Sequence, residues 1–459
     1  MLRTPKLLPI LLIGWPFYAH AQSSPELRQI LERLDRLERE NHALADEVHA
    51  LRAELAASRP APAQPPAESA ASTPAAAPAA DIPERLEIVE RRVEEQAQTK
   101  VEAAQKFPIR LTGMALFNAF SNSRDNADSD YPGIAQSAQG SRAGATFRQT
   151  VLGLEYRGPQ AVWGGRVSGN VYMDFYGTPG TPLNETMRLR TGQIQVEWNT
   201  RSVMVGLEKP IFNPREPSSL ARVGVSPLTG AGNLWLWIPQ VRFEQDFRVG
   251  ETSGVRAQVG VVQTREVGAY NDPAGATQTE RARPGLEGRF EWYKRFDDDR
   301  RIEIAPGFHT STSHAYGGSI PSNLFSLDWM IAPVRRVQVT GAFYTGQNVA
   351  HLGTGSVRQG FSEYNGFVRP VHSIGGWSQL TLQAASRLSF HLFSGQMDDR
   401  NSDLRTGALG KNLVFGGNFF YNLAANVIVS LEATQTRSTY IGTGLRHNNH
   451  YDLAVAYLF

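Results

Sequence analysis

Residues 447–459, HNNHYDLAVAYLF, decide the fold of this chain. Apolar side chains stand at every second position, while polar or small side chains fill the positions between them. Such alternation is typical of a β-strand with two different faces. The apolar face holds Tyr451, Leu453, Val455, Tyr457 and Phe459, and the other face holds His450, Asp452, Ala454, Ala456 and Leu458.

The same pattern continues upstream to residue 107, in segments of about ten residues separated by Gly, Pro, Asn and Asp. We count sixteen candidate strands, joined by eight long links on one side and seven tight turns on the other. A soluble sandwich would also alternate, but aromatic residues concentrate near the strand ends, as a membrane girdle requires. The sequence therefore predicts an all-β transmembrane antiparallel barrel over residues 107–459, with about 16 strands and an aqueous lumen.

The first 21 residues predict a cleaved export signal. Arg3 and Lys6 precede an apolar run from Leu7 to Trp15, and Ala19-His20-Ala21 fits the small-residue cleavage pattern. The alternative is a membrane anchor, but the run is too short to cross about 30 Å of hydrocarbon. Because the chain is exported and forms a barrel, we expect it in the cell outer membrane, with its N-terminal region in the periplasm.

Residues 22–57 predict an α-helical coiled coil, because eight of nine seam positions are apolar and Asn41 is the exception. A seam of this kind needs a partner helix, so a homo-oligomer is expected; the heptads leave dimer or trimer open. Residues 58–81 follow as a Pro/Ala-rich linker, and residues 82–106 as a short amphipathic helix. The seam consists of Leu27, Ile30, Leu34, Leu37, Asn41, Leu44, Val48, Leu51 and Leu55.

The composition excludes several classes of functional site and partner. The chain has no cysteine, which excludes disulfides, thiol nucleophiles and zinc–cysteine sites. Residues 107–459 carry 33 basic and 28 acidic side chains, a net of +5 that is too small to indicate a nucleic-acid partner. No motif for a cofactor or a metal site stands out, and no catalytic residue is assigned.

The chain resembles Gram-negative outer-membrane porins. Its last strand, ending in Phe459, looks like the signal read by the barrel-assembly machinery. The order of export signal, coiled coil, linker and barrel is similar to the DcaP-type porins, as are the short segments 187–190, 205–208 and 238–243. The resemblance implies a homotrimer in outer-membrane lipid, with one pore per subunit and a third external loop folded inward.

The third long link, residues 209–234, is then the expected pore constriction. Opposed fixed charges at a narrow wet passage set an ion preference. Strand parity adds further side chains to the lumen wall, although charged walls are also ordinary in any porin. The candidate constriction and lumen residues are Arg215, Glu216, Arg222, Arg242, Glu244, Arg256, Arg289 and Arg387. The parity of Arg188 and Arg190 points instead to the lipid face, which leaves a headgroup position, a subunit contact or a β-bulge open.

These features predict passive diffusion of small hydrophilic solutes, with a preference for anionic solutes left open. Two alternatives stand beside it. One is an outer-membrane barrel enzyme of protease or phospholipase type, for which Ser311, Ser313 and His314 are candidates by proximity in sequence. The other is an anchor, in which the N-terminal region ties the outer membrane to peptidoglycan.

Overall fold

A computed structural model describes residues 109–138, 140–177, 186–264, 283–315, 318–353, 359–364 and 367–459. These residues lie in one compact unit, residues 90–459, of the two into which the chain divides. The predicted signal peptide, coiled coil, linker and amphipathic helix lie outside the described residues. No helix in the described part is long and apolar enough to cross a membrane.

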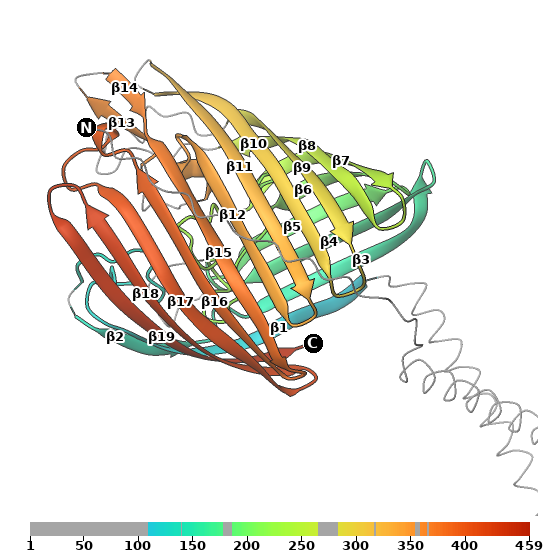
Figure 1. Cartoon of the computed structure of the whole chain (residues 1–459), viewed down its shortest axis with the longest axis horizontal. Helices are drawn as coiled ribbons and strands as arrows, with labels where there is room; N and C mark the ends of the chain where they lie inside the picture. Colours follow the sequence, from blue (N-terminus) through green and yellow to red (C-terminus); the bar gives the residue numbers. More distant parts are fainter. Residues whose placement is uncertain are drawn as a thin grey trace, which may run out of the picture. The chain divides into compact units, whose positions relative to one another are not determined.

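The described chain is almost entirely β-strand (Figure 1). The first half contains β1 (Ile109–Asn122), β2 (Arg142–Thr146), β3 (Val151–Val162), β4 (Gly165–Asp174), β5 (Arg188–Glu197), β6 (Arg201–Glu208), β7 (Ile238–Val249), β8 (Ser253–Thr264) and β9 (Arg283–Arg295). The second half contains β10 (Arg301–Ala315), β11 (Gly318–Val334), β12 (Val337–Gln347), β15 (His372–Ala385), β16 (Leu388–Asp399), β17 (Leu409–Ala424), β18 (Val427–Tyr440) and β19 (Gly444–Leu458).

These strands form one closed antiparallel barrel. Each strand pairs with the next along the chain, and β19 returns to pair with β1, where Phe117 lies opposite Val455. The segments β2 and β3 pair with the upper and lower halves of β1, so they are one strand interrupted at residues 147–150. Of the 17 strands in the sheet, two therefore count as one, which leaves sixteen. The predicted fold class and strand number are confirmed.

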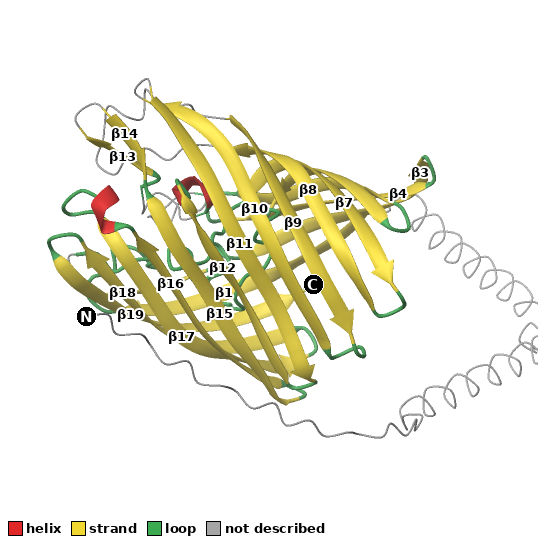
Figure 2. Cartoon of the chain, turned by 45° about the horizontal axis from the view of Figure 1, so that its top comes forward, coloured by secondary structure: helices red, strands yellow, loops and turns green. Residues whose placement is uncertain are grey.

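The loops and turns also alternate as predicted. Turns of two to five residues join the strands at the end where β1 begins and β19 ends. The other end carries the loops, including the 3-10 helices η1 (Ala350–Leu352) and η3 (Asn401–Asp403) and the hairpin of β13 (Phe361–Tyr364) and β14 (Phe367–Pro370) (Figure 2). Two predicted long links are short, because β10 and β11 are separated only by residues 316–317, and β18 and β19 by residues 441–443.

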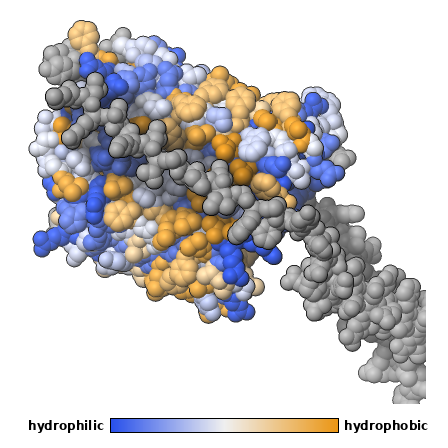
Figure 3. Space-filling model, in the orientation of Figure 1, coloured by the Kyte–Doolittle hydropathy of each residue, from blue (hydrophilic) through white to orange (hydrophobic). Residues whose placement is uncertain are grey.

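The barrel is apolar outside and polar inside. On β19, Tyr451 is 57% exposed, whereas its neighbours His450 and Asp452 are buried. Apolar side chains therefore cover much of the visible outer face, with hydrophilic residues gathered toward its ends (Figure 3). Exposed aromatic residues mark the turn end, as a girdle at a membrane interface would. They include Trp163, Trp292, Phe296, Tyr421, Tyr457 and Phe459.

Candidate functional site

The loop between β6 and β7, residues 209–237, is the feature that distinguishes the barrel interior; we call it L3. Every residue of L3 is buried or half-buried, which is unusual for a loop of this length. Its partners are side chains that face inward from strands all around the wall. L3 therefore crosses the inside of the barrel rather than covering its rim.

The first part of L3 is bound to β9, β10 and β11. The Ile211 backbone N–H donates to Glu287 Oε2 at 2.7 Å, and Ser326 Oγ donates to the Phe212 carbonyl at 3.0 Å. The Phe212 ring packs edge-on against His309, at 6.2 Å between ring centroids. Backbone and aromatic contacts thus fix the direction in which the loop enters the lumen.

Arg215 of L3 then binds three carboxylates. Its Nε lies 2.6 Å from Asp328, and its Nη2 lies 2.8 Å from Glu303 and 3.2 Å from Glu291. Arg289 on β9 binds the same Asp328 at 2.7 Å and Glu291 at 2.6 Å. Charge-assisted bonds of this geometry are the strong ones in proteins.

Two more wall residues extend the pairing toward β7. Arg256 on β8 binds Glu291 at 2.9 Å, and its Nε lies 3.5 Å from Glu244. Arg301 on β10 also lies 3.4 Å from Glu303. The resulting set of four cations and four carboxylates spans β7 to β11 and the loop. We call it the ionic network; it consists of Arg215, Arg256, Arg289, Arg301, Glu244, Glu291, Glu303 and Asp328.

The middle of L3 is bound to the opposite wall. The Ser218 backbone N–H donates to Gln379 on β15 at 2.7 Å, and the Ser219 hydroxyl donates to Glu432 on β18 at 2.5 Å. Asn118 on β1 donates to the Leu220 carbonyl at 2.9 Å. Because the ionic network holds the loop on one side and these bonds on the other, L3 bridges the lumen.

The last part of L3 contacts an arginine-rich surface near β5. Gln149 accepts from the Val223 and Gly224 backbone N–H groups at 2.9 and 2.8 Å. Arg188 and Arg190 donate to the carbonyls of Gly224 and Val223. L3 is therefore attached to the wall along its whole length.

Most of the predicted lumen residues are brought together by the structure. Arg215, Glu244, Arg256 and Arg289 all belong to the ionic network, and Arg242 lies on the same inward face of β7. Glu216 is separate from the network and pairs with Lys209 at 2.5 Å within L3. Among the described residues, Arg242 forms no ion pair.

Two predicted residues take other places. Arg222 is buried and donates to the carbonyl of Pro132, so it supports the packing of L3 rather than lining open space. Arg387 was expected on the wall, but it lies in the exposed two-residue turn between β15 and β16. The prediction for Arg387 is wrong because β16 begins at Leu388, two residues later than the alternation of its sequence suggests.

The facing of Arg188 and Arg190 is explained by a β-bulge. Opposite β4, Tyr172 pairs with Thr191 and Met173 pairs with Leu189, so Arg190 has no partner residue. One extra residue reverses the faces of the strand beyond it. Both guanidiniums therefore turn inward, where they bind Asp174 at 2.7 and 2.9 Å.

Sequence reasoning missed the partners of these arginines. Asp174 is fully buried at the end of β4, and Trp237 at the end of L3 lies under both guanidiniums, 4.9 Å from Arg188 and 4.8 Å from Arg190. Trp237 also contacts Trp235, with 4.7 Å between the ring centroids. These contacts depend on the register shift in β5, and a single sequence gives no sign of that shift.

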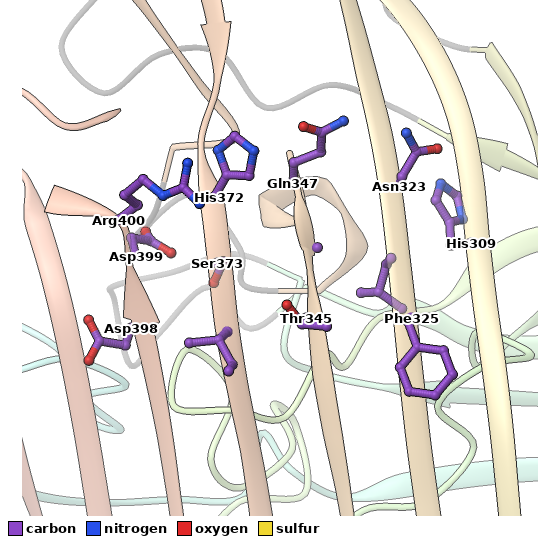
Figure 4. A pocket seen from close by; sticks show the side chains of 13 residues that line it. His309, Asn323, Phe325, Thr345, Gln347, His372, Ser373, Asp398, Asp399 and Arg400 are labelled. Atoms are coloured by element: carbon purple, nitrogen blue, oxygen red, sulfur yellow. The ribbon is translucent and has the colours of Figure 1, made fainter. Parts of the chain in front are cut away.

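A separate pocket lies across the loop ends of β11, β12, β15 and β16 (Figure 4). Its lining includes Phe325 and Ile374, which belong to the outward-facing set and are each 49% exposed. We therefore assign the pocket to the outer side of the wall, not to the passage through the barrel. Within the described residues, no group of three His, Asp or Glu side chains could hold a metal ion.

The fold and the internal loop define a class: a sixteen-stranded antiparallel transmembrane β-barrel with a loop that crosses its interior. Its fold is that of the outer membrane channel DcaP of Acinetobacter baumannii, with a TM-score of 0.65 over 76% of this chain and 97% of that chain, at 15% identity. The anion-selective porin from Comamonas acidovorans is also similar, with a TM-score of 0.54, 10% identity, and 76% and 99% of the two chains covered. No family model matches the sequence, and no curated protein matches it.

Proposed function

We propose that the protein is an outer-membrane porin through which small hydrophilic solutes diffuse passively, past the constriction formed by L3 and the charged wall. The observation that carries this proposal is the path of L3, which crosses a polar lumen while the outer face of the barrel is apolar. The likeness to an outer membrane channel and to an anion-selective porin supports it at the level of the fold.

The same proposal places the barrel in outer-membrane lipid and the N-terminal region in the periplasm. Tyr451, Leu453, Val455, Tyr457 and Phe459 all face outward on the last strand, which suits a signal that the barrel-assembly machinery would read. The heptads of residues 22–57 support a homo-oligomer, and the resemblance to the DcaP-type porins supports a trimer.

Ion preference in this proposal depends on the arginines that lack carboxylate partners. Three predicted pore arginines, Arg215, Arg256 and Arg289, are compensated within the ionic network. Arg242 is the one of these four wall and loop arginines that forms no ion pair among the described residues, so its charge is the least compensated of the four. We therefore propose a weak preference for anions, carried mainly by Arg242.

The test is single-channel recording of the purified protein in a planar bilayer, with the reversal potential measured under a KCl gradient. Stepwise openings are expected, and the sign of the reversal potential should indicate anion preference. A folded, inserted barrel that conducts no ions would contradict the porin proposal. A cation-selective reversal potential would contradict only the role of Arg242.

One arrangement favours a second function, that of a hydrolase. His309 Nδ1 lies 3.0 Å from Glu287 Oε1, and His309 Nε2 lies 2.9 Å from Ser311 Oγ, as in a serine–histidine–carboxylate triad. The predicted candidate Ser311 is thus present, but its histidine is His309; His314 instead contacts Arg283. Ser311 is 8% exposed, and Phe212 and His351 pack on the histidine, which leaves little room for a substrate.

A fluorophosphonate probe separates the two functions. Covalent labelling of the folded protein that is lost in Ser311→Ala would support the hydrolase. The porin proposal expects no labelling, because Glu287 and His309 then serve to hold L3. Ser313→Ala is the matched control, since Ser313 lies on the same face of β10.

The anchor function is tested separately from the pore. Removal of residues 22–106 should leave conductance intact if the barrel alone forms the pore. Loss of envelope integrity in cells with this truncation would support a contact with peptidoglycan.

A further inference from the structure

A group of cations lies on the outer face of the barrel, at the loop end of β16, β17 and β18. These strands are neighbours in the sheet and lie side by side in Figure 1. Lys411 on β17 and Arg437 on β18 face outward, because the register places them on the same face as Phe415, which is 37% exposed. Two exposed arginines follow in the loop between β16 and β17. We call these four cations the basic patch; they are Arg400, Arg405, Lys411 and Arg437.

The carboxylates around the basic patch leave it with surplus positive charge. Asp398 on β16 lies 3.3 Å from Lys411, and the two side chains are 39% and 43% exposed. The other two acids of this region are buried, since Asp399 is 3% exposed and Asp403 is bound to His372 at 2.8 Å. In this part of the described chain, one exposed carboxylate therefore accompanies four cations, and the patch suits an anionic partner.

Arg437 is held in position while its charge stays uncompensated. Its Nε donates to Gln435 Oε1 at 2.7 Å, and its Cζ lies 5.2 Å from the centroid of the Phe415 ring. Within the described residues it forms no ion pair. Lys411 lies opposite Thr439, two residues from Arg437, so the two cations occupy diagonal positions on neighbouring strands. Such positions are about 7–8 Å apart, a spacing at which one phosphate can accept from both side chains.

The basic patch lies at the edge of the apolar band on the loop side. Arg437 is ten residues beyond Val427, the first residue of β18, which is about 34 Å along the strand. At a strand tilt of about 40°, this corresponds to a height of roughly 26 Å above the turn end, and the apolar band of such barrels is about 25 Å tall. Lys411 lies one row nearer the loops. Both cations therefore lie at the level of lipid headgroups.

A groove lies below the basic patch, toward the turn end. It has a volume of about 720 Å³ and crosses the outer faces of β16 to β19 and β1. Gly417 and Ala433 lie opposite each other in its floor, four residues from Arg437 along β18. Phe390 and Tyr451 border it and are 40% and 57% exposed. Because small residues form the floor, the groove has room for an acyl chain; we call it the outer groove.

We propose that this face of the barrel binds one phosphorylated lipid of the outer leaflet, of the lipid A type. Its phosphate lies between Lys411 and Arg437, and one of its acyl chains lies in the outer groove. The surplus positive charge selects an anionic headgroup, and the height of the patch matches the level of that headgroup. The proposal rests on the proposed location in the outer membrane but not on conduction.

Native mass spectrometry of the full chain, folded in a neutral detergent and titrated with diphosphoryl lipid A, tests the site. Saturable binding of one lipid A per subunit is expected, in preference to phosphatidylethanolamine. The double variant Lys411→Gln/Arg437→Gln should bind about 25-fold more weakly, at about fivefold for each cation. Equal binding by the double variant and the wild type would overturn the proposal.

Lys294→Gln is the matched control. Lys294 also faces outward, on the same face of β9 as the exposed Trp292, but it lies at the turn end. Its loss should leave lipid A binding unchanged. An equal loss of binding in Lys294→Gln and in the double variant would show attraction to any surface cation, and would overturn the site.

Two comparisons separate the phosphate from the acyl chain. The wild-type protein should bind monophosphoryl lipid A more weakly than the diphosphoryl form, and this comparison requires no variant to fold. Ala433→Leu should weaken binding severalfold, because the new side chain fills the floor of the outer groove. Equal binding of both lipids would overturn the role of the phosphate, and unchanged binding by Ala433→Leu would overturn the role of the groove.

The same spectra report a competing occupant, a second copy of the chain. If the double variant or Ala433→Leu dissociates the oligomer in the absence of lipid, this face is a subunit contact and the lipid site is overturned. Single-channel conductance should be unchanged in both variants, because the three substituted residues face away from the lumen. A barrel that never conducts would contradict the porin proposal, yet lipid A binding would still be measurable.

Discussion

Arg215 is the single side chain of L3 on which the ionic network depends. It is 11% exposed and binds three carboxylates from β9, β10 and β11. Arg215→Gln should destabilise the folded barrel by about 3 kcal/mol, because removal of one partner leaves buried charges without compensation. It should also raise single-channel conductance, since the loop is no longer held to this wall. Thermal unfolding and bilayer recordings measure the two effects.

The matched control for Arg215 is Lys209, a second cation of the loop. Lys209 pairs with Glu216, but both side chains are about one third exposed. Lys209→Gln should therefore change stability by less than about 1 kcal/mol. Equal effects of the two substitutions would show that the ionic network does not hold L3.

Arg242 and Arg256 make a matched pair for ion selectivity. Both face inward from neighbouring strands, but only Arg256 is bound to carboxylates. Arg242→Gln should move the reversal potential toward cation selectivity. Arg256→Gln should move it in the same direction. We expect this shift to be the smaller one, because Arg256 is already bound to Glu244 and Glu291. A larger shift for Arg256 would contradict the assignment of anion preference to Arg242.

For single residues, the sequence predicts which side chains face the lumen better than it predicts which side chains they bind. Parity placed Arg242, Arg256 and Arg289 on the inner wall because lipid demands an apolar outer face on every strand. It gave no sign that Asp328 would bind both Arg215 and Arg289, since those residues meet only after L3 has folded inward. The ionic network joins positions more than 100 residues apart, and no local pattern records such a contact.

At the scale of the element, β1 and β19 close the barrel, and one glycine allows them to do so. A side chain at Gly113 would place its Cβ 2.3 Å from the Val151 carbonyl oxygen and 2.8 Å from the Phe459 ring. The Gly113 backbone also exchanges hydrogen bonds with Phe459, at 3.0 and 3.2 Å. The final strand therefore needs both its terminal aromatic residue and a glycine opposite it.

Gly113→Val should prevent closure of the barrel. The folded wild-type protein should migrate differently from the heat-denatured form on a denaturing gel, and the variant should lose this folded band. Gly140→Ala is the control, because a Cβ at Gly140 meets no atom within 4 Å. A folded Gly113→Val protein with normal mobility would show that the seam tolerates a side chain.

The bulge in β5 places Arg188 and Arg190 against one carboxylate, that of Asp174. Asp174 is fully buried and is the shared acceptor of Arg188 and Arg190. Asp174→Asn should cost about 3–5 kcal/mol of stability, because two guanidiniums then lie together without their counter-charge. Chemical unfolding of the variant measures this loss. A change below about 1 kcal/mol would mean that the bulge leaves both arginines hydrated.

Element boundaries show why alternation predicts strands more reliably than loops. All sixteen strands were found, because each must present one apolar face to lipid over its whole length. The links 313–321 and 439–446 were predicted to be long, yet β10, β11, β18 and β19 extend into them. Polar residues such as Ser319 and Arg446 continue these strands toward the loop end of the barrel, where no lipid imposes alternation.

For the whole molecule, we expect the N-terminal region and the barrel to have separate roles. The barrel closes on itself through β1 and β19, so its fold requires no other segment. The coiled-coil seam, with Leu34, Leu37 and Leu44 among its apolar positions, cannot be buried by one chain alone. We therefore expect residues 22–57 to set the number of subunits, and residues 107–459 to set the pore.

A chain that lacks residues 22–106 should still fold and conduct, with single openings of unchanged size. Openings of the full-length protein should occur in multiples of three, whereas those of the truncated protein should lose this grouping if the coiled coil holds the trimer together. Asn41→Leu in the full-length chain is the informative companion, because an apolar residue at the one polar seam position should strengthen association and relax the choice of subunit number. Mass measurement in detergent, alongside the recordings, reports subunit number directly. A truncated chain that remains trimeric would assign assembly to the barrel wall and leave the coiled coil with the anchoring role.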